Sequence, residues 1–230
     1  MAIDLPPSRL LWAAELPRGA FTLGALLLRG TPKEGPRGDG RPVLLIPGLV
    51  IGDRALIPMR RYLTRLGYQA ETWGLGRNLG ARTVGTENER LHARIEALAA
   101  ARGPVTLIGV SLGGLMARLA AHRLGPELVR QVISIASPYA AGPRATNVWR
   151  AFQLFTGERI DDPGLTARLA ELARPLPVPT SAIWSASDGL VQGLACHDPH
   201  ARAVRLRGSH LGVHFRASVL RAVAAELARG

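Results

Sequence analysis

Short apolar runs alternate with amphipathic stretches along most of the chain. The apolar runs with the length and aliphatic content of buried strands are residues 43–46, 68–72, 105–108, 132–135, 180–184 and 203–206. Apolar residues at helical spacing predict helices at residues 55–66, 86–101, 112–124 and 213–228. Strands separated by helices imply crossover connections, so we expect an α/β fold with a mainly parallel sheet of about six strands and helices on both faces. Ligands bind such sheets at the carboxyl ends of the strands.

The segment before the first strand has a different pattern. Its apolar residues are interrupted by Glu15, Pro17 and Arg18 and predict two short helices, at residues 8–16 and 20–28. We expect both helices to pack against the core. The loop at residues 34–42, rich in glycine and proline, then leads into the sheet. We interpret residues 1–230 as a single domain, since a chain of this length is able to bury one sizeable core.

Residues 138–179 form the longest insertion between predicted strands. They contain two short helical patterns, and the first places Trp149, Phe152 and Phe155 largely on one face. One interpretation is a helical cap or lid over the site, with these three aromatic residues binding substrate. The other is a pair of ordinary crossover helices packed on the sheet. An apolar helix face suits both interpretations.

A serine stands where a predicted strand gives way to a helix, in the sequence Gly-Val-Ser-Leu-Gly from Gly109 to Gly113. This G-x-S-x-G pattern between a strand and a helix is typical of a sharp turn that exposes a nucleophilic serine above the sheet. The flanking glycines are needed because side chains there would clash. We therefore predict that Ser111 is a nucleophile. The alternative is a tight turn with a serine that caps the helix.

A nucleophilic serine needs a base and an acid that orients the base. In this type of fold the acid and then the histidine follow the serine along the chain. Asp188 follows the fifth predicted strand and His210 follows the sixth, so both should lie at the same sheet edge as Ser111. Asp198 is a rival acid, and His214 is expected to lie within the last helix, facing away from the site. Asp188 also suits an ordinary turn, and His210 an ordinary loop or helix cap.

The backbone N–H groups of Leu49 and Leu112 are the predicted oxyanion donors, because they follow the first strand and the nucleophile respectively. At this point the chain resembles the α/β-hydrolase superfamily, and within it small bacterial lipases and esterases. The resemblance runs from about Arg41 to the C-terminus and implies Ser111, Asp188 and His210 as the triad, with no cofactor. Those relatives often carry His-Gly where this chain has Pro47 and Gly48.

Three other features carry weaker signals. The sequence Trp-Gly-Leu-Gly-Arg-Asn-Leu-Gly that ends at Gly80 lacks the spacing of a dinucleotide fingerprint. It suits either an active-site loop shaped by Arg77 and Asn78 or an ordinary turn. The sequence around Cys196, His197 and His200 matches no familiar zinc spacing, so we expect no metal. His92 and His122 fall in helical patterns and are expected to be exposed.

The composition of the chain limits the classes of molecule that we expect it to bind. The 230 residues are 47% hydrophobic and carry a formal net charge of +12, nearly all of it from arginine, since Lys33 is the only lysine. The arginines, Arg118 among them, are scattered along predicted helices and no nucleic-acid motif is present, so we expect solvated helix faces and no nucleic-acid partner. One cysteine excludes an intrachain disulfide, and no signal peptide or membrane span is evident. We therefore expect a cytoplasmic protein, for which peripheral contact with a membrane is a minority interpretation.

These patterns together predict a serine hydrolase of carboxylic esters, acting on a small-molecule or lipid ester. Acyltransferases and thioesterases use the same triad and oxyanion donors. The alternative from another class is a non-catalytic relative that binds a ligand or an anionic membrane.

Overall fold

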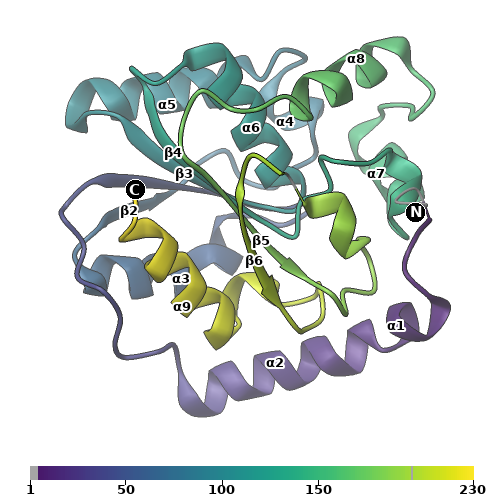
Figure 1. Ribbon diagram of the computed structural model, residues 1–230, viewed down its shortest axis with the longest axis horizontal. Helices are drawn as coiled ribbons and strands as arrows, with labels where there is room; N and C mark the ends of the chain where they lie inside the picture. The colour runs from purple at the N-terminus through teal and green to yellow at the C-terminus, as the bar shows by residue number, and fades with distance from the viewer. Residues whose placement is uncertain (1–4, 198) are drawn as a thin grey trace.

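The computed structural model describes residues 5–197 and 199–230. Within them, a sheet of six parallel strands has the order β2-β1-β3-β4-β5-β6 (Figure 1). The strands are β1 (Pro42–Ile46), β2 (Gln69–Thr72), β3 (Val105–Val110), β4 (Val129–Ile135), β5 (Thr180–Ser185) and β6 (Arg202–Leu206). Each of the six predicted strands is therefore confirmed, and the α/β class with them.

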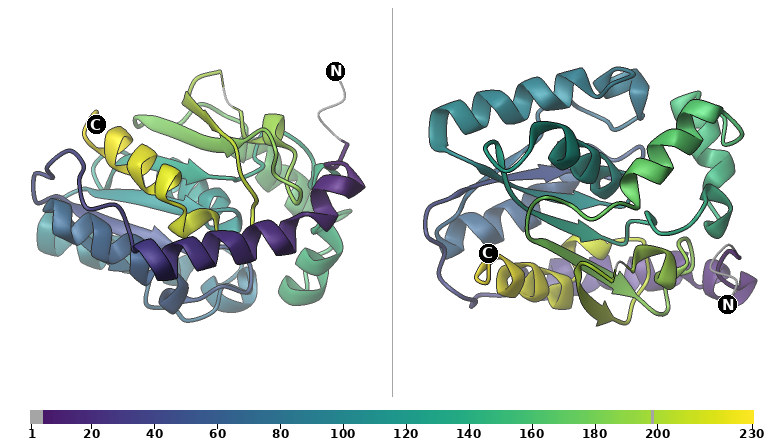
Figure 2. Two further views of the ribbon diagram at one scale, coloured as in Figure 1. Left: turned by 90° about the horizontal axis from the view of Figure 1, so that it is seen from below. Right: turned by 45° about the horizontal axis from the view of Figure 1, so that its top comes forward.

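Helices cover both faces of this sheet (Figures 1 and 2). α3 (Asp53–Leu66) and α9 (Ala217–Leu227) pack on one face, and α5 (Glu89–Arg102) and α6 (Leu112–Leu124) on the other. Alternate residues of β1 enter the two cores: Val43 and Leu45 face α3, whereas Leu44 and Ile46 face α5 and α6. Burial on both faces explains why the inner strands β1 and β3 are nearly continuous apolar runs, whereas the edge strands β2 and β6 carry polar, partly exposed residues.

The chain reverses its direction of winding between β1 and β3. From β1 it passes through α3 to β2 at one sheet edge, and from β3 it passes through α6 to β4 on the other side. The loops after β1 and β3 therefore diverge to opposite faces of the sheet. Such a switch point leaves a crevice at the carboxyl ends of the strands, which is where parallel sheets bind ligands.

Two helices predicted from the sequence start later than expected. The helix expected at residues 86–101 is preceded by the short α4 (Ala81–Val84), and Asn88 has a left-handed backbone with φ of 60°, so α5 starts at Glu89. The helix expected from residue 213 is divided into a 3-10 turn (Val213–Phe215) and α9, because Arg216 between them is extended. His214 therefore precedes the helix, and its predicted placement was wrong.

α1 (Arg9–Ala13) and α2 (Glu15–Arg29) precede the sheet and run along one side of the molecule (Figure 2). α2 is longer than expected because Pro17 lies in its first turn, where the missing N–H is not needed by the helix. The expectation of apolar core packing was wrong: the buried residues of α2 are Glu15, Gly19 and Thr22. In the described part of the chain, no helix combines the length and apolar character of a membrane span.

Three side chains expected in solvent lie inside the protein. Arg118 is fully buried on α6, with its guanidinium 3.9 Å from the centre of the Tyr139 ring. It donates hydrogen bonds to the carbonyl oxygens of Leu172 (3.0 Å) and Arg174 (2.9 Å), which buried backbone acceptors require. His92 and His122 are half-buried, and burial lowers the pKa of each.

The segment formed by residues 138–179, here called the cap segment, connects β4 to β5. It contains α7 (Trp149–Thr156) and α8 (Pro163–Leu172), in agreement with the two predicted short helices, and a 3-10 turn (Pro143–Ala145). A further 3-10 turn (Gly193–Cys196) lies between β5 and β6. Because Arg118 binds the carbonyl oxygens at and just after the end of α8, the cap segment is attached directly to α6.

Candidate active site

Ser111 lies in a strained turn between β3 and α6. Its φ of 52° and ψ of −117° fall in a region that residues with a side chain rarely adopt. The turn is held by the Ser111 N–H, which donates to the carbonyl oxygen of Ile135 at 2.8 Å. A Cβ on Gly109 would come within 2.2 Å of the Gly113 carbonyl oxygen, and one on Gly113 within 2.4 Å of that of Ile46. The prediction that both glycines are required by close packing is therefore confirmed.

Leu49 lies in the loop after β1, directly across the switch point from Ser111. Asn78 is fully buried and fixes this loop. Its side-chain Nδ2 donates to the Pro47 carbonyl oxygen at 2.7 Å, and its backbone carbonyl oxygen accepts from the Val50 N–H at 2.7 Å. The Asn78 N–H in turn donates to Ile51 at 2.9 Å. Of the two interpretations of this segment, the loop shaped by Asn78 fits the structure.

Asp188 and His210 meet at the carboxyl ends of β5 and β6. The Asp188 Oδ2 lies 2.7 Å from the His210 Nδ1. The other carboxylate oxygen accepts from the N–H groups of Leu190 and Val191, both at 2.8 Å, so the carboxylate is fixed on both sides. The Asp188 side chain is only 2% exposed and that of His210 is 11% exposed. This arrangement suits an acid that orients a histidine base.

The pKa of His210 is raised above its usual value. Burial by itself would lower it, but the charge and hydrogen bond of Asp188 and the charge of Glu15 outweigh burial. His214, in contrast, is buried without such a partner, and burial together with the nearby His210 lowers its pKa to about 4. The two histidines are therefore distinct: the pKa of His210 lies above the usual histidine value, and that of His214 lies well below it.

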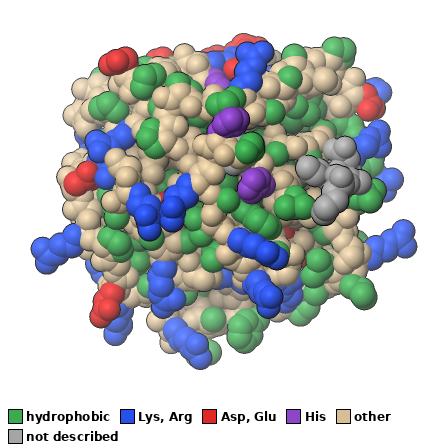
Figure 3. All heavy atoms as spheres, in the orientation of Figure 1, with side chains coloured by type: hydrophobic (Ala, Val, Ile, Leu, Met, Phe, Trp, Pro, Cys, Tyr) green, Lys and Arg blue, Asp and Glu red, His purple; other side chains and the backbone are tan. Residues whose placement is uncertain are grey.

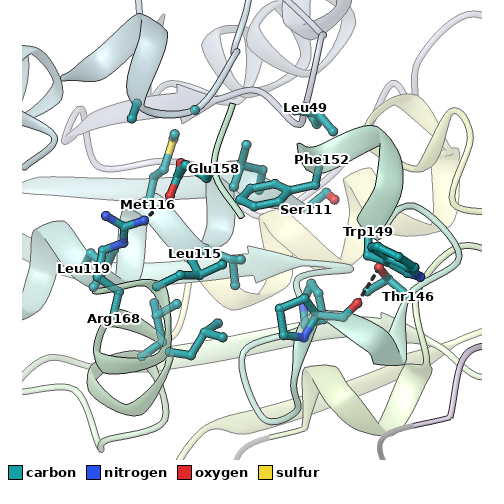
Figure 4. A pocket seen from close by; sticks show the side chains of 18 of the residues that line it. Leu49, Ser111, Leu115, Met116, Leu119, Thr146, Trp149, Phe152, Glu158 and Arg168 are labelled. Atoms are coloured by element: carbon teal, nitrogen blue, oxygen red, sulfur yellow. Dashed lines mark hydrogen bonds and ion pairs between the residues drawn. The ribbon is translucent and has the colours of Figure 1, made fainter. Parts of the chain in front are cut away.

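Ser111 opens into an apolar cavity of about 130 Å³ beneath the cap segment (Figure 4). Leu49 and Leu112, the predicted oxyanion donors, line it together with Ser111. Its apolar wall comes from α6, α7, α8 and the loops beside them and includes Leu115, Met116, Leu119, Trp149, Phe152, Leu165, Leu169, Leu172 and Val191. An ion pair between Glu158 and Arg168 lies on the side away from Ser111 (Figure 4).

Of the three aromatic residues predicted to bind substrate, Trp149 and Phe152 line this cavity. Phe155 does not: it is 39% exposed and lies outside the lining. The reason is helical geometry, because each step of three residues turns the side chain by about 60° around the axis. Two such steps carry Phe155 out of the cavity that Trp149 faces.

The other predicted site residues are placed as follows. Among the residues described, no hydrogen bond joins Ser111 to His210, so the contact within this group is that between Asp188 and His210. The rival acid Asp198 lies outside the described residues. Within the described chain, no three histidine, cysteine or acidic side chains are grouped so as to hold a metal ion. Cys196 is buried, which raises the pKa of its thiol well above the usual value.

Solved structures resemble the chain over most of its length. The mature lipase BlEst2 from Bacillus licheniformis has a TM-score of 0.62 at 16% identity, over 86% of this chain and 96% of that chain. A structure of the metagenome-derived lipolytic enzymes LipS and LipT gives 0.62 at 16%, over 87% and 99%. The thioesterase domain from the curacin biosynthetic pathway gives 0.56 at 16%, over 84% and 93%. No protein-family model and no curated protein matches the sequence.

This chain has the α/β-hydrolase fold. At identities this low the similarity establishes the fold and not the activity. Activity has to be argued from the residues at the carboxyl ends of the strands, because α/β-hydrolase folds carry many functions on the same scaffold.

On this fold, α2 holds the loops that carry Asp188 and His210. Glu15 is 2% exposed, and its Oε1 accepts from the N–H groups of Gly189 (2.7 Å) and His210 (3.0 Å). Its Oε2 accepts from the Leu211 N–H at 2.9 Å. One carboxylate thus joins the loop after β5 to the loop after β6.

Two more polar residues of α2 extend this support. The Arg18 guanidinium donates to the carbonyl oxygen (2.8 Å) and hydroxyl (3.0 Å) of Ser187, next to Asp188. The Thr22 hydroxyl accepts from Arg216 at 2.9 Å. α2 also approaches these loops closely, since a Cβ on Gly19 would lie 2.8 Å from the Cβ of Leu211.

Sequence reasoning missed this role of Glu15 and Arg18. Both residues were noticed only as breaks in an apolar run. A usable signal was present, since Glu15, Arg18 and Thr22 recur at helical spacing between apolar residues and so share one polar face. Nothing in the sequence states which loops that face meets.

We expect Glu15→Gln to lower both the pKa of His210 and the free energy of unfolding. The substitution removes a negative charge that raises this pKa, and it turns an NH₂ group toward backbone N–H donors. The loss of a hydrogen bond to a charged group costs about 1.5–3 kcal/mol. NMR titration of the histidine Cε1 protons, assigned with a His210→Gln variant, measures the pKa, and urea unfolding measures stability.

Glu34→Gln is the matched control, because this glutamate is exposed on the loop after α2. It should leave both quantities unchanged. A Glu15→Gln protein with wild-type stability and an unchanged His210 titration would show that the Glu15 contacts do not support the histidine loop.

Proposed function

We propose that this protein is a serine hydrolase of carboxylic esters. One observation supports this above all: the hydrogen-bonded pair of Asp188 and His210 lies at the same sheet edge as the strained Ser111. A strained backbone at a polar residue beside a cavity is typical of a functional site. The order serine, aspartate and histidine along the chain agrees with that of other α/β-hydrolases.

The proposed reaction proceeds in two acyl-transfer steps. The Ser111 Oγ attacks the acyl carbon as the His210 Nε2 takes its proton, and His210 then gives that proton to the leaving alcohol. Water attacks the acyl-enzyme with His210 again as base, which releases the acid and restores Ser111. Asp188 accepts a hydrogen bond from Nδ1 and stabilises the charged imidazole, while the N–H groups of Leu49 and Leu112 stabilise the oxyanion.

The cavity supports an ester with a short acyl chain. Its walls are predominantly apolar, and its volume is about 130 Å³. Sites for larger ligands measure about 300–1,000 Å³. A protein cavity of about 150 Å³ accommodates a benzene molecule, so the acyl group that fits here is of about that size. The proposed role of the cap segment is to form the wall of this acyl site with Trp149 and Phe152.

Ser111→Ala should abolish hydrolysis of p-nitrophenyl esters while the protein stays folded. Removal of a triad nucleophile lowers kcat by about 10⁶ in a protease with this chemistry. The wild-type enzyme should be labelled by a fluorophosphonate probe, and the variant should not. Turnover by folded Ser111→Ala protein at the wild-type rate would refute the assignment. A wild-type protein that cleaves thioesters and not oxygen esters would instead make it a thioesterase.

The pH profile of kcat/KM should fall toward low pH with a midpoint above about 6.5, the usual pKa of histidine. Protonated His210 cannot accept the serine proton, and its pKa is raised by Asp188 and Glu15. Asp188→Asn should lower both the rate and the midpoint, because a neutral amide no longer stabilises the imidazolium. His214→Gln serves as control: its pKa of about 4 predicts an unchanged midpoint. A midpoint that moves only in the His214 variant would contradict the assignment.

Phe152→Ala should shift the preferred ester toward longer acyl chains. The substitution enlarges the cavity, and each buried methylene contributes about 0.8 kcal/mol, or about fourfold in kcat/KM. Phe155→Ala, on the same helix but outside the lining, is the matched control and should leave the profile unchanged. The measurement is kcat/KM for p-nitrophenyl esters from acetate to palmitate. Equal shifts in both variants would refute the placement of the acyl site.

A further inference from the structure

α2 is an amphipathic helix with its polar face turned inward. Glu15, Arg18 and Thr22 bind the catalytic loops, and the opposite face carries large apolar side chains. Phe21 is 79% exposed, Leu27 77% and Leu28 88%. The other exposed apolar side chains of α1, α2 and the residue range before them are Leu5, Leu10, Trp12, Leu16 and Leu23. An exposed apolar surface this continuous is typical of an interaction site.

The surroundings of this apolar surface are basic. Arg9 and Arg29 on the helices are exposed, as are Lys33 and Glu34 just after them, whereas Glu15, the acidic residue of the two helices, is buried against the catalytic loops, so the exposed charges of α1 and α2 are all positive. Along the lower edge of Figure 3, where Figure 1 places α2, apolar and basic side chains predominate. The whole chain carries a formal net charge of +12. The partner that complements both properties is therefore anionic and apolar.

We propose that α1 and α2 dock on an anionic lipid bilayer. Helices that lie in the membrane interface bury leucine, phenylalanine and tryptophan among the lipid chains and keep basic residues near the headgroups. A second copy of this chain fits less well, because the basic residues beside the apolar surface would face their own like charges. This docking does not depend on the proposed hydrolase activity.

The docked face is joined to the catalytic end of the sheet. The Asn147 Nδ2 donates to the carbonyl oxygen of Pro7, just before α1, and to that of Gly189, next to Asp188. α1 therefore lies beside the segment that leads into α7. A bilayer bound to α1 would therefore lie near the segment that leads into α7, the helix whose Trp149 and Phe152 line the cavity.

The test is sedimentation of the full chain with lipid vesicles. Binding to vesicles of phosphatidylcholine with phosphatidylglycerol should exceed binding to phosphatidylcholine alone and should weaken as salt is added. Phe21→Ser/Leu27→Ser should weaken binding to the anionic vesicles by about tenfold for each side chain. Both side chains are exposed, so circular dichroism and thermal unfolding should match the wild type.

Charge is tested with a matched pair of variants. Arg9→Gln/Arg29→Gln should weaken binding by about fivefold for each charge. Arg159→Gln/Arg174→Gln removes the same net charge beside α8, on the side of the molecule away from α2 (Figure 1), and should bind as the wild type does. Equal losses in both pairs would overturn docking through α2.

Light scattering tests whether a second copy of the chain, instead of lipid, covers the apolar surface. We expect a wild-type monomer in the absence of lipid. A wild-type dimer that the Phe21→Ser/Leu27→Ser substitution converts to monomer, without vesicle binding, would identify a second copy as the occupant and overturn the proposal. Because binding is measured without hydrolysis, failure of the proposed activity would not affect this result.

Discussion

The close contact between β3, α6 and β1 around Ser111 is the constraint on which the site depends. A left-handed backbone at a residue with a side chain costs about 1–3 kcal/mol and persists only where the surroundings enforce it. Here enforcement comes from the Ser111 N–H bond to Ile135 and from the approach of Gly113 to the carbonyl oxygen of Ile46. The same contact fixes the end of β1, from which the loop carrying Leu49 begins. The serine and its proposed oxyanion donor are thus placed by one packing arrangement.

Much of this core could be predicted because the local residue pattern and the packing of the whole fold favour the same structure there. Apolar positions marked all six strands, but the reason differs among them: β1 and β3 are buried along their whole length, whereas the edge strands β2 and β6 carry exposed polar residues. Ser111 was identifiable because its turn needs glycines at fixed positions. Asp188 and His210 were predicted from their order after the strands, and the structure brings them into hydrogen-bond contact.

The predictions that were wrong have other physical causes. Arginine is usually a surface residue, but Arg118 has long-range partners at the end of α8 and in the Tyr139 ring that make its burial tolerable. Phe155 was misplaced because a stripe of aromatic residues three apart drifts around the helix. α2 was misplaced because the usual rule puts the apolar face inward. For Arg118 and α2 the deciding contacts lie far away in the sequence, where periodicity carries no information, whereas the position of Phe155 follows from the helix itself.

The contact between the Glu15 carboxylate and the histidine loop affects the order in which the parts of the chain fold. Its contact with the His210 N–H spans 195 positions of the chain. Contacts of such sequence separation form late, after the loop-closure entropy of the intervening chain has been lost. During synthesis the sheet from β1 to β5 is able to condense while α2 still lacks the partners of its polar face. We therefore expect the histidine loop to be ordered only after the last strand has been synthesised and has docked onto α2, a helix made long before it.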